Sequence, residues 1–164
     1  MRVLLILTYI VAAGMLLVLV GGRCNKLLER GGMPAYLKLY RHREHVDVVS
    51  CLEVIEHVPD PGQLIKACSD LLKPDGQMFL STLNRNPRSF ITAILGAEYI
   101  FNILPKGTHE WAKFIKPSEL EGFMRDAGIK LIESKGMFYN PIFHTANLNN
   151  DLGVNYMMHG SKNA

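Results

Sequence analysis

The chain begins with a segment that is far more apolar than the rest of the sequence. Residues 3–20 carry no charge, and only Thr8, Tyr9 and Gly14 interrupt their apolar side chains. A run of about 18 such residues is the lower limit for a helix that spans a bilayer. The pattern predicts a membrane helix, a secretory signal sequence, or a buried strand, turn and helix at a truncated or misread start of the domain.

Basic residues flank this segment and set its expected orientation. Arg2 precedes it, and Arg23, Lys26 and Arg30 follow it. If the segment spans a membrane, the larger positive charge places its C-terminal side in the cytoplasm. The Gly21–Cys24 stretch is a poor cleavage site for a signal peptidase, which weighs against the secretory signal.

Regular structure of an α/β type is predicted after this region. Residues 47–52 are short, apolar and β-branched, as in a buried parallel strand. A Pro-Asp-Pro-Gly turn at 59–62 precedes apolar residues at helical spacing over 64–72, and 77–82 predict the next strand. A strand, helix and strand with such short joints form a βαβ unit, which predicts a parallel sheet with helices on both faces.

The second half of the chain predicts a different layer of elements. Residues 90–104 form an unusually apolar helical stretch, and 117–127 predict a second helix that starts at Pro117 and stops at Gly128. Strands are predicted over 129–134 and 154–159.

The apolar stretch 90–104 allows two interpretations. It is too short for a span and contains Glu98, so it either packs on the sheet or lies in a membrane interface. Basic residues at Arg85, Arg88 and Lys106 favour the interface. We therefore expect residues 85–116 to form a lid or interfacial insertion.

Three residues whose side chains could bind a ligand follow the first clear strand. Glu53, Glu56 and His57 stand at positions i, i+3 and i+4, so a helical turn projects them from one face. Two carboxylates and an imidazole can hold a divalent cation. The alternative is a surface pair of Glu56 with His57, beside a Glu53 that only caps or is solvated. The location after a strand end, where α/β sheets bind ligands, makes the two interpretations equally tenable.

Composition and charge narrow the class of protein. The 164 residues fit one domain, and the 48% hydrophobic share is large enough for a core. A net charge of +3 without a basic run or stripe predicts no nucleic-acid partner. Three widely spaced cysteines, Cys24, Cys51 and Cys68, exclude a disulfide framework and a four-cysteine zinc site, and they favour a reducing compartment.

Several motifs in order along the chain resemble a known family. Residues 46–61 resemble the fourth strand and following loop of class I S-adenosylmethionine-dependent methyltransferases. Downstream motifs are similar to the ubiquinone-biosynthesis O-methyltransferase family, and the match covers about residues 46–160. These motifs are Leu72–Gly76, Phe79–Asn86, Gly96–Ile100, Pro105–His109, Lys113–Pro117 and Tyr139–Pro141.

The resemblance implies an activity and a set of site residues. It implies methyl transfer from S-adenosylmethionine to a catechol-type hydroxyl on a polyprenylated ubiquinone precursor. By resemblance, the backbone of Leu52 contacts the cofactor, and Glu53, Glu56 and His57 match magnesium-ligand positions. His109 is the expected catalytic residue beside the ring; the alternative is a loop histidine that bonds to a carbonyl group. A bound Mg²⁺ would lower the pKa of the attacking hydroxyl and orient it.

The resemblance also implies partners and a cellular location. The substrate would be a polyprenylated phenol or quinol, whose isoprenoid tail brings the enzyme to a membrane lipid surface. Other ubiquinone-biosynthesis proteins are further expected partners. The expected location is the cytoplasmic side of the inner membrane, where the protein is either peripheral or anchored by residues 3–20.

The N-terminal part departs from the family pattern. The family carries a Gly-rich loop after its first strand and an acidic residue after its second, and neither is found here. We therefore divide the chain into an apolar segment at 1–22, a linker or remnant at 23–45, and the C-terminal portion of a methyltransferase domain at 46–164. The expected fold is an incomplete Rossmann-like class I sheet. The alternatives are an inactive, membrane-tethered remnant that acts as a partner, or a methyltransferase for another small hydroxylated ring.

Overall fold

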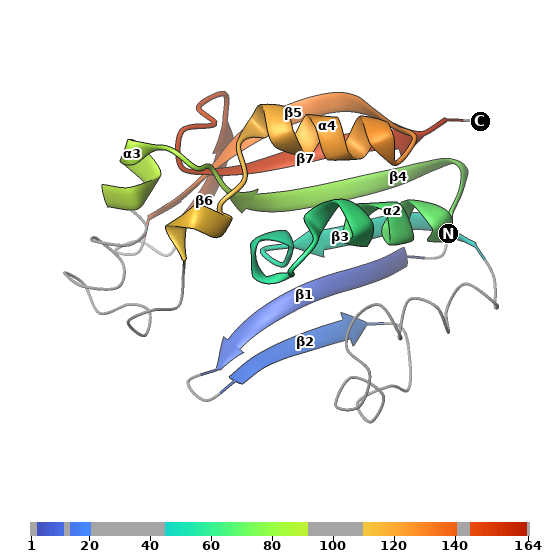
Figure 1. Ribbon diagram of the computed structural model, residues 1–164, viewed down its shortest axis with the longest axis horizontal. Helices are drawn as coiled ribbons and strands as arrows, with labels where there is room; N and C mark the ends of the chain where they lie inside the picture. Colours follow the sequence, from blue (N-terminus) through green and yellow to red (C-terminus); the bar gives the residue numbers. More distant parts are fainter. Residues whose placement is uncertain (1–2, 12–13, 21–44, 92–109, 141–144, 164) are drawn as a thin grey trace.

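The computed structural model describes residues 3–11, 14–20, 45–91, 110–140 and 145–163. Their strands form one sheet with the order β2-β1-β3-β4-β7-β5-β6 (Figure 1). The strands are β1 (Val3–Val11), β2 (Gly14–Val20), β3 (Val46–Leu52), β4 (Leu72–Leu83), β5 (Ile129–Asn140), β6 (Thr145–Asn149) and β7 (Asn155–Lys162). The helices are η1 (Ile55–His57), α2 (Pro61–Leu71), α3 (Pro87–Ser89), η3 (Trp111–Lys113) and α4 (Pro117–Asp126).

The predicted βαβ unit is confirmed as β3, α2 and β4. The strands β3 and β4 are parallel, with Cys51 opposite Leu80. The helix α2 begins where the sequence predicts, because the Asp60 side chain accepts a hydrogen bond from the Gln63 N–H at 2.9 Å and Pro61 occupies the first turn. A strand with neighbours on both sides is largely buried and therefore mostly apolar, which explains the pattern of β3, whose residues are buried or half-buried.

The other edge of the sheet is antiparallel. The strand β7 lies between β4 and β5 and runs antiparallel to both. Gly160 permits this packing, since a Cβ there would stand 2.6 Å from both Ile129 Cγ2 and Met124 Cε. The predicted strands at 129–134 and 154–159 are confirmed, whereas β6, with all five residues exposed, was not predicted.

The N-terminal apolar segment is a pair of strands. The strand β1 pairs parallel with β3, and β2 pairs antiparallel with β1. The expectation of a membrane helix at 1–22 is therefore wrong, whereas the anchoring of the chain through residues 3–20 stays a prediction. A uniformly apolar segment shows neither the helical nor the strand periodicity of polar and apolar residues, so the sequence alone does not distinguish the two. Backbone hydrogen bonds to β3 stabilise the strand. No helix within the described ranges is long and apolar enough to cross a bilayer.

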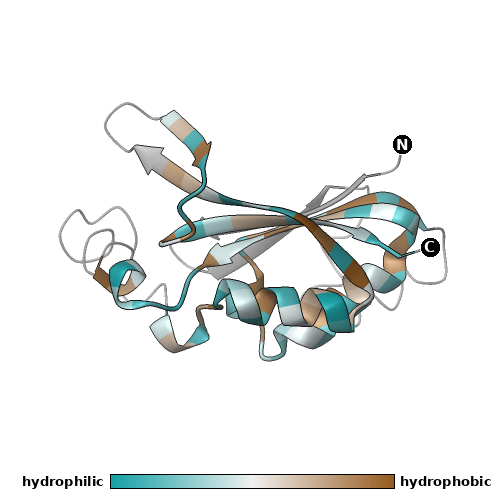
Figure 2. Cartoon of the chain, turned by 90° about the horizontal axis from the view of Figure 1, so that it is seen from above, coloured by the Kyte–Doolittle hydropathy of each residue, from teal (hydrophilic) through white to brown (hydrophobic). Residues whose placement is uncertain are grey.

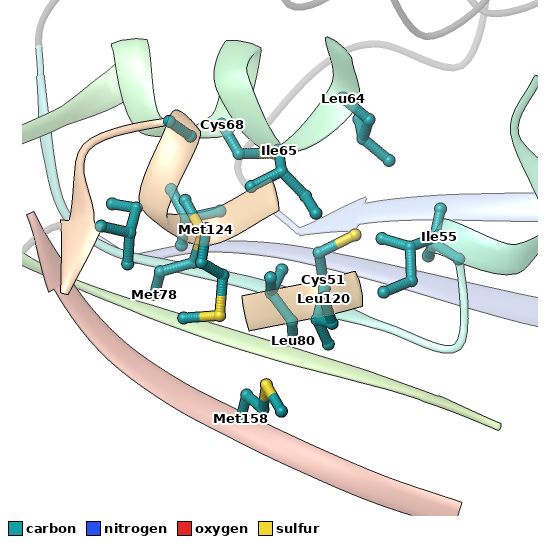
Figure 3. Close-up of a cluster of buried hydrophobic side chains, with 14 of the residues drawn as sticks. Cys51, Ile55, Leu64, Ile65, Cys68, Met78, Leu80, Leu120, Met124 and Met158 are labelled. Atoms are coloured by element: carbon teal, nitrogen blue, oxygen red, sulfur yellow. The ribbon is translucent and has the colours of Figure 1, made fainter. Parts of the chain in front are cut away.

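The hydrophobic core lies between the sheet and the two longer helices. In Figure 2 the helical ribbons gather on one side of the sheet, and α2 packs against α4. Figure 3 shows buried side chains from β3, β4, β7 and both helices meeting there, among them Cys51, Cys68, Met124 and Met158. Burial raises the pKa of the Cys68 thiol to about 12, so this cysteine acts as a small apolar group.

Candidate functional site

A sharp turn follows the carboxyl end of β3. Glu53 adopts a positive φ of 54°, which is uncommon for a residue other than glycine. Its backbone N–H donates to the Ser81 carbonyl oxygen at 3.2 Å and also lies 3.1 Å from Ser81 Oγ. Left-handed backbone of this kind is found at ligand sites more often than elsewhere. The turn therefore fixes Glu53 against the end of β4.

Two adjacent hydroxyls on β4 hold the two carboxyl groups of the motif. Ser81 Oγ donates to Glu53 Oε1 at 2.7 Å, and Thr82 Oγ1 donates to Glu56 Oε2 at 2.9 Å. Because successive strand residues face opposite sides of the sheet, the two hydroxyls reach the carboxyls from either side of the strand end. Sequence reasoning did not assign a role to Ser81 or Thr82, although both are at the carboxyl end of the predicted strand 77–82, where ligands bind in α/β sheets.

Glu56 is buried, and one of its two carboxyl oxygens has no hydrogen-bond partner. Its exposed fraction is 2%, and its Oε1 has no hydrogen-bond donor. His57 Nε2 lies 3.9 Å from this oxygen, beyond hydrogen-bond range. Burial and, next, the neighbouring Glu53 carboxylate raise the pKa of Glu56 to about 8. A buried carboxyl of this kind is stabilised by a proton or by a cation.

The donor chemistry of this cluster fits a divalent cation, but its geometry is not that of a completed site. Glu53, Glu56 and His57 are neighbours around the unpartnered oxygen, on a 3-10 turn and the residues before it. Over the described part of the chain, no three His, Cys, Asp or Glu side chains converge as metal ligands. The alternative pair of Glu56 with His57 is present at 3.9 Å, but it is not a surface pair, since Glu56 is buried.

The burial of Glu56 leads to an expected pH dependence of stability. The folded chain keeps a proton that the unfolded chain releases, so the free energy of unfolding should fall as pH rises from about 4.5 to about 8. The contribution is at most about 1.4 kcal/mol per pH unit. Glu56→Gln, which mimics the protonated group, should remove this slope in urea unfolding. The exposed Glu121→Gln is the matched control; parallel curves for wild type and Glu56→Gln would contradict the assignment.

The remaining predicted site residues lie in different situations. Leu52 is the last residue of β3, is half-buried, and pairs with Leu7 of β1 on one side and Ser81 of β4 on the other. It therefore stands at the carboxyl edge of three parallel strands, where the resemblance expects cofactor contact. His109 lies outside the described residues, and its catalytic role stays a prediction.

The segment after β4 is clamped to the loop before β7. Asn86 Nδ2 donates to the Gly153 carbonyl at 2.8 Å, and Trp111 Nε1 donates to the Asn86 carbonyl at 3.1 Å. Phe90 meets Trp111 edge-to-face, with ring centroids 6.2 Å apart. The exposed fractions are 39% for Phe90, 59% for Ile91 and 37% for Trp111, so this clamp presents an apolar patch to the surface. The rest of the expected helix at 90–104 lies outside the described residues.

Known proteins resemble both the sequence and the fold. A family model for a methyltransferase domain matches residues 25–134. The ubiquinone biosynthesis O-methyltransferase of Marinobacter nauticus is 57% identical over 125 residues, which cover 74% of this chain and 52% of that protein. The protein of the same name from Nitrosospira multiformis is 49% identical over 138 residues, covering 80% of this chain and 58% of that protein.

A solved structure supports the fold. A SAM-dependent methyltransferase from Thermotoga maritima, described as a possible histamine N-methyltransferase, aligns with a TM-score of 0.52 and 25% identity. The alignment covers 73% of this chain and 57% of that one.

These comparisons confirm the predicted fold class and the resemblance to ubiquinone biosynthesis O-methyltransferases. The cofactor that they support is S-adenosylmethionine. The chain spans about half the length of the curated relatives that it matches. With a methyltransferase model over most of its length, the chain belongs to the methyltransferase-domain family.

Proposed function

We propose that this chain is part of an S-adenosylmethionine-dependent O-methyltransferase that acts on a catechol-type hydroxyl of a polyprenylated ubiquinone precursor. The observation that carries the proposal is the carboxyl pair of Glu53 and Glu56, tethered by Ser81 and Thr82 where β3 and β4 end. The names of the relatives supply the substrate class. The site supplies groups that suit a phenol more than an amine, because a carboxyl pair can take up the phenolic proton.

The reaction needs alignment and the removal of one proton. The phenolic oxygen attacks the methyl carbon, the carbon–sulfur bond breaks, and its electron pair stays on sulfur. The carboxyl pair can exchange the phenolic proton because the raised pKa of Glu56, about 8, lies near neutral pH. The alternative role is a metal site: Glu53, Glu56 and His57 would hold Mg²⁺ as the resemblance implies, and the ion, in place of proton exchange by Glu56, would lower the pKa of a bound hydroxyl. The unpartnered Glu56 Oε1 supports this assignment. His109 is the proposed catalytic residue beside the ring.

A labelled-methyl assay tests the proposed function. The chain, completed with the N-terminal half of a relative, is incubated with S-adenosylmethionine carrying a labelled methyl group and a short-chain prenylcatechol. We expect the label in a phenolic ether. Histamine is the contrasting acceptor, since the structural neighbour is described as a possible histamine N-methyltransferase. Label on histamine, or no label on the catechol, would overturn the proposal.

The exposed apolar patch of Phe90, Ile91 and Trp111 supports a lipid partner. We place this patch against the membrane surface that holds the prenylated substrate, on the cytoplasmic side of the inner membrane. Clusters of large exposed apolar side chains are uncommon on soluble surfaces unless they bind something. The nearby Arg88 pairs with Asp151 at 2.7 Å, so it shapes the loop in addition to any contact with lipid.

A double substitution tests the lipid contact. Phe90→Ser with Ile91→Ser should weaken binding to anionic liposomes about 30-fold, because burial of two large side chains contributes roughly 2 kcal/mol. Trp111 is the single tryptophan, so the blue shift of its fluorescence reports contact with lipid at this patch. Ile132→Ser, at an equally exposed isoleucine of β5, is the control. Unchanged liposome binding in the double variant, with the circular dichroism spectrum intact, would exclude the patch.

A further inference from the structure

A second buried polar atom lacks a partner. Among side chains in the described ranges, only Glu56 Oε1 and Asn155 Oδ1 are buried nitrogen or oxygen atoms without a hydrogen bond. Buried polar atoms are satisfied in nearly all proteins, and the exceptions require an explanation. Glu56 belongs to the carboxyl pair already described. Asn155 has no role in anything derived above.

Asn155 stands at the same edge of the sheet as the carboxyl pair. It is the first residue of β7 and pairs with Leu83, the last residue of β4. Because β7 runs antiparallel to β4, its start meets the carboxyl end of β4, where Ser81 holds Glu53. The two unpartnered atoms are therefore found around one strand end.

The face of the sheet follows from the alternation of β7. The next residue, Tyr156, points to the helix side, where its hydroxyl donates to the Ile115 carbonyl at 2.8 Å. Asn155 therefore points to the opposite face, with Met157, whose partner on β4 is Ser81. Diagonal neighbours across a strand pair lie about 7–8 Å apart. Asn155 and Ser81, the residue that holds Glu53, are such diagonal neighbours.

The backbone before Asn155 is held in place by the segment after β4. Asn84 Nδ2 donates to the Leu152 carbonyl at 2.8 Å, and the Asn84 N–H donates to the Val154 carbonyl at 2.7 Å. Asn86 Nδ2 donates to the Gly153 carbonyl at 2.8 Å. Three consecutive carbonyls are fixed in this way, so Asn155 is placed before any ligand arrives. An acceptor that is fixed in advance binds a ligand donor without further ordering.

We infer that Asn155 is a substrate-orienting residue whose Oδ1 accepts a hydrogen bond from a ring hydroxyl of the phenolic substrate. The inference rests on the proposed function and names a contact that the motif Glu53, Glu56 and His57 does not include. A catechol carries two adjacent hydroxyls. One is methylated near the carboxyl pair, and the other, on the neighbouring ring carbon, can donate to Asn155.

Binding of a short-chain prenylcatechol to the full chain, measured by isothermal titration, tests the inference. Asn155→Leu keeps the size of the side chain and removes the acceptor, so we expect about 5- to 20-fold weaker binding. Asn155→Asp keeps an acceptor and should bind nearly as well as wild type. The dimethoxy analogue, which has no hydroxyl to donate, should bind wild type and Asn155→Leu equally. Asn147→Leu, at an exposed asparagine of β6, is the control.

Stability gives a second readout. If Asn155 Oδ1 has no hydrogen-bond donor until a ligand binds, Asn155→Leu removes an unsatisfied buried atom. The substitution should then raise the melting temperature of the ligand-free chain by a few degrees. A lower melting temperature with unchanged catechol affinity would mean a structural role and would overturn the inference. Equal losses for catechol and for its dimethoxy analogue would also overturn it. A wild-type chain that binds no prenylcatechol would overturn the proposed function together with this inference.

Discussion

Replacing residues 1–45 with the N-terminal half of a ubiquinone biosynthesis O-methyltransferase should raise the affinity for S-adenosylmethionine by at least about 100-fold. The strand β1 has the neighbour expected of a first strand, because it lies parallel to β3. The next element, however, is the antiparallel β2, and the sequence after β1 lacks the glycines that let a backbone approach the cofactor. Two lost hydrogen bonds to charged cofactor groups, at about 1.5–3 kcal/mol each, account for this factor.

Isothermal titration of the native and grafted chains with S-adenosylmethionine and S-adenosylhomocysteine measures the difference. The control is the same graft with the glycines of its loop changed to valine. This chain has the full N-terminal half, but its loop backbone cannot come close to the cofactor. Micromolar affinity in the native chain would show that its own N-terminal residues form a cofactor site. No affinity in the intact graft would favour the inactive-remnant alternative.

The carboxyl pair should be as important for catalysis as the N-terminal half is for the cofactor. In the grafted chain, Glu53→Ala with Glu56→Ala should lower kcat/KM for the prenylcatechol by at least about 100-fold. Both substitutions remove groups that touch the reacting oxygens in the proposed site. The fold should persist, because Glu56 is a buried acid whose Oε1 has no partner. Each loss removes the carboxyl acceptor of one buried β4 hydroxyl, Ser81 or Thr82.

A chelator separates the two roles of the pair. If the pair holds Mg²⁺, the parent chain should lose activity in EDTA and regain it with added Mg²⁺, whereas the double variant should respond to neither. Glu121→Ala, an exposed carboxylate of α4, should behave as the parent. Full activity in the double variant would exclude any catalytic role for the pair. A parent enzyme unaffected by EDTA would leave proton transfer as the role of the carboxyls and exclude the metal.

Local sequence signals were sufficient for the central part of the fold. The capping Asp60, the proline at the start of each longer helix and the apolar β3 specify β3, α2, β4 and α4. These signals act between residues a few positions apart, so they can be recognised without a structure. The spacing of Glu53, Glu56 and His57 likewise indicates the candidate site from the sequence alone.

Other features depend on residues that are distant in sequence. The segment Val3–Val20 is uniformly apolar, and only the partner strand β3 makes its first half a strand and not a helix. The strand β6 is only five residues long and fully exposed, so its alternation of Ala146 and Leu148 with polar residues marks no buried face. The unmatched oxygens of Glu56 and Asn155 are visible only once their surroundings are assembled.

The sequence by itself determined the family, the βαβ centre and the position of the carboxyl motif. Each of these depends on the type and spacing of residues within a short segment of the chain. The tertiary structure decided which carboxyl is buried. Thr82 lies 26 positions from Glu56 and donates a hydrogen bond to its carboxyl group. The structure also brought Asn155 to the end of β4, through strand pairing across more than 70 positions. Burial and pairing over such separations depend on how the whole sheet is assembled, and no local pattern encodes them.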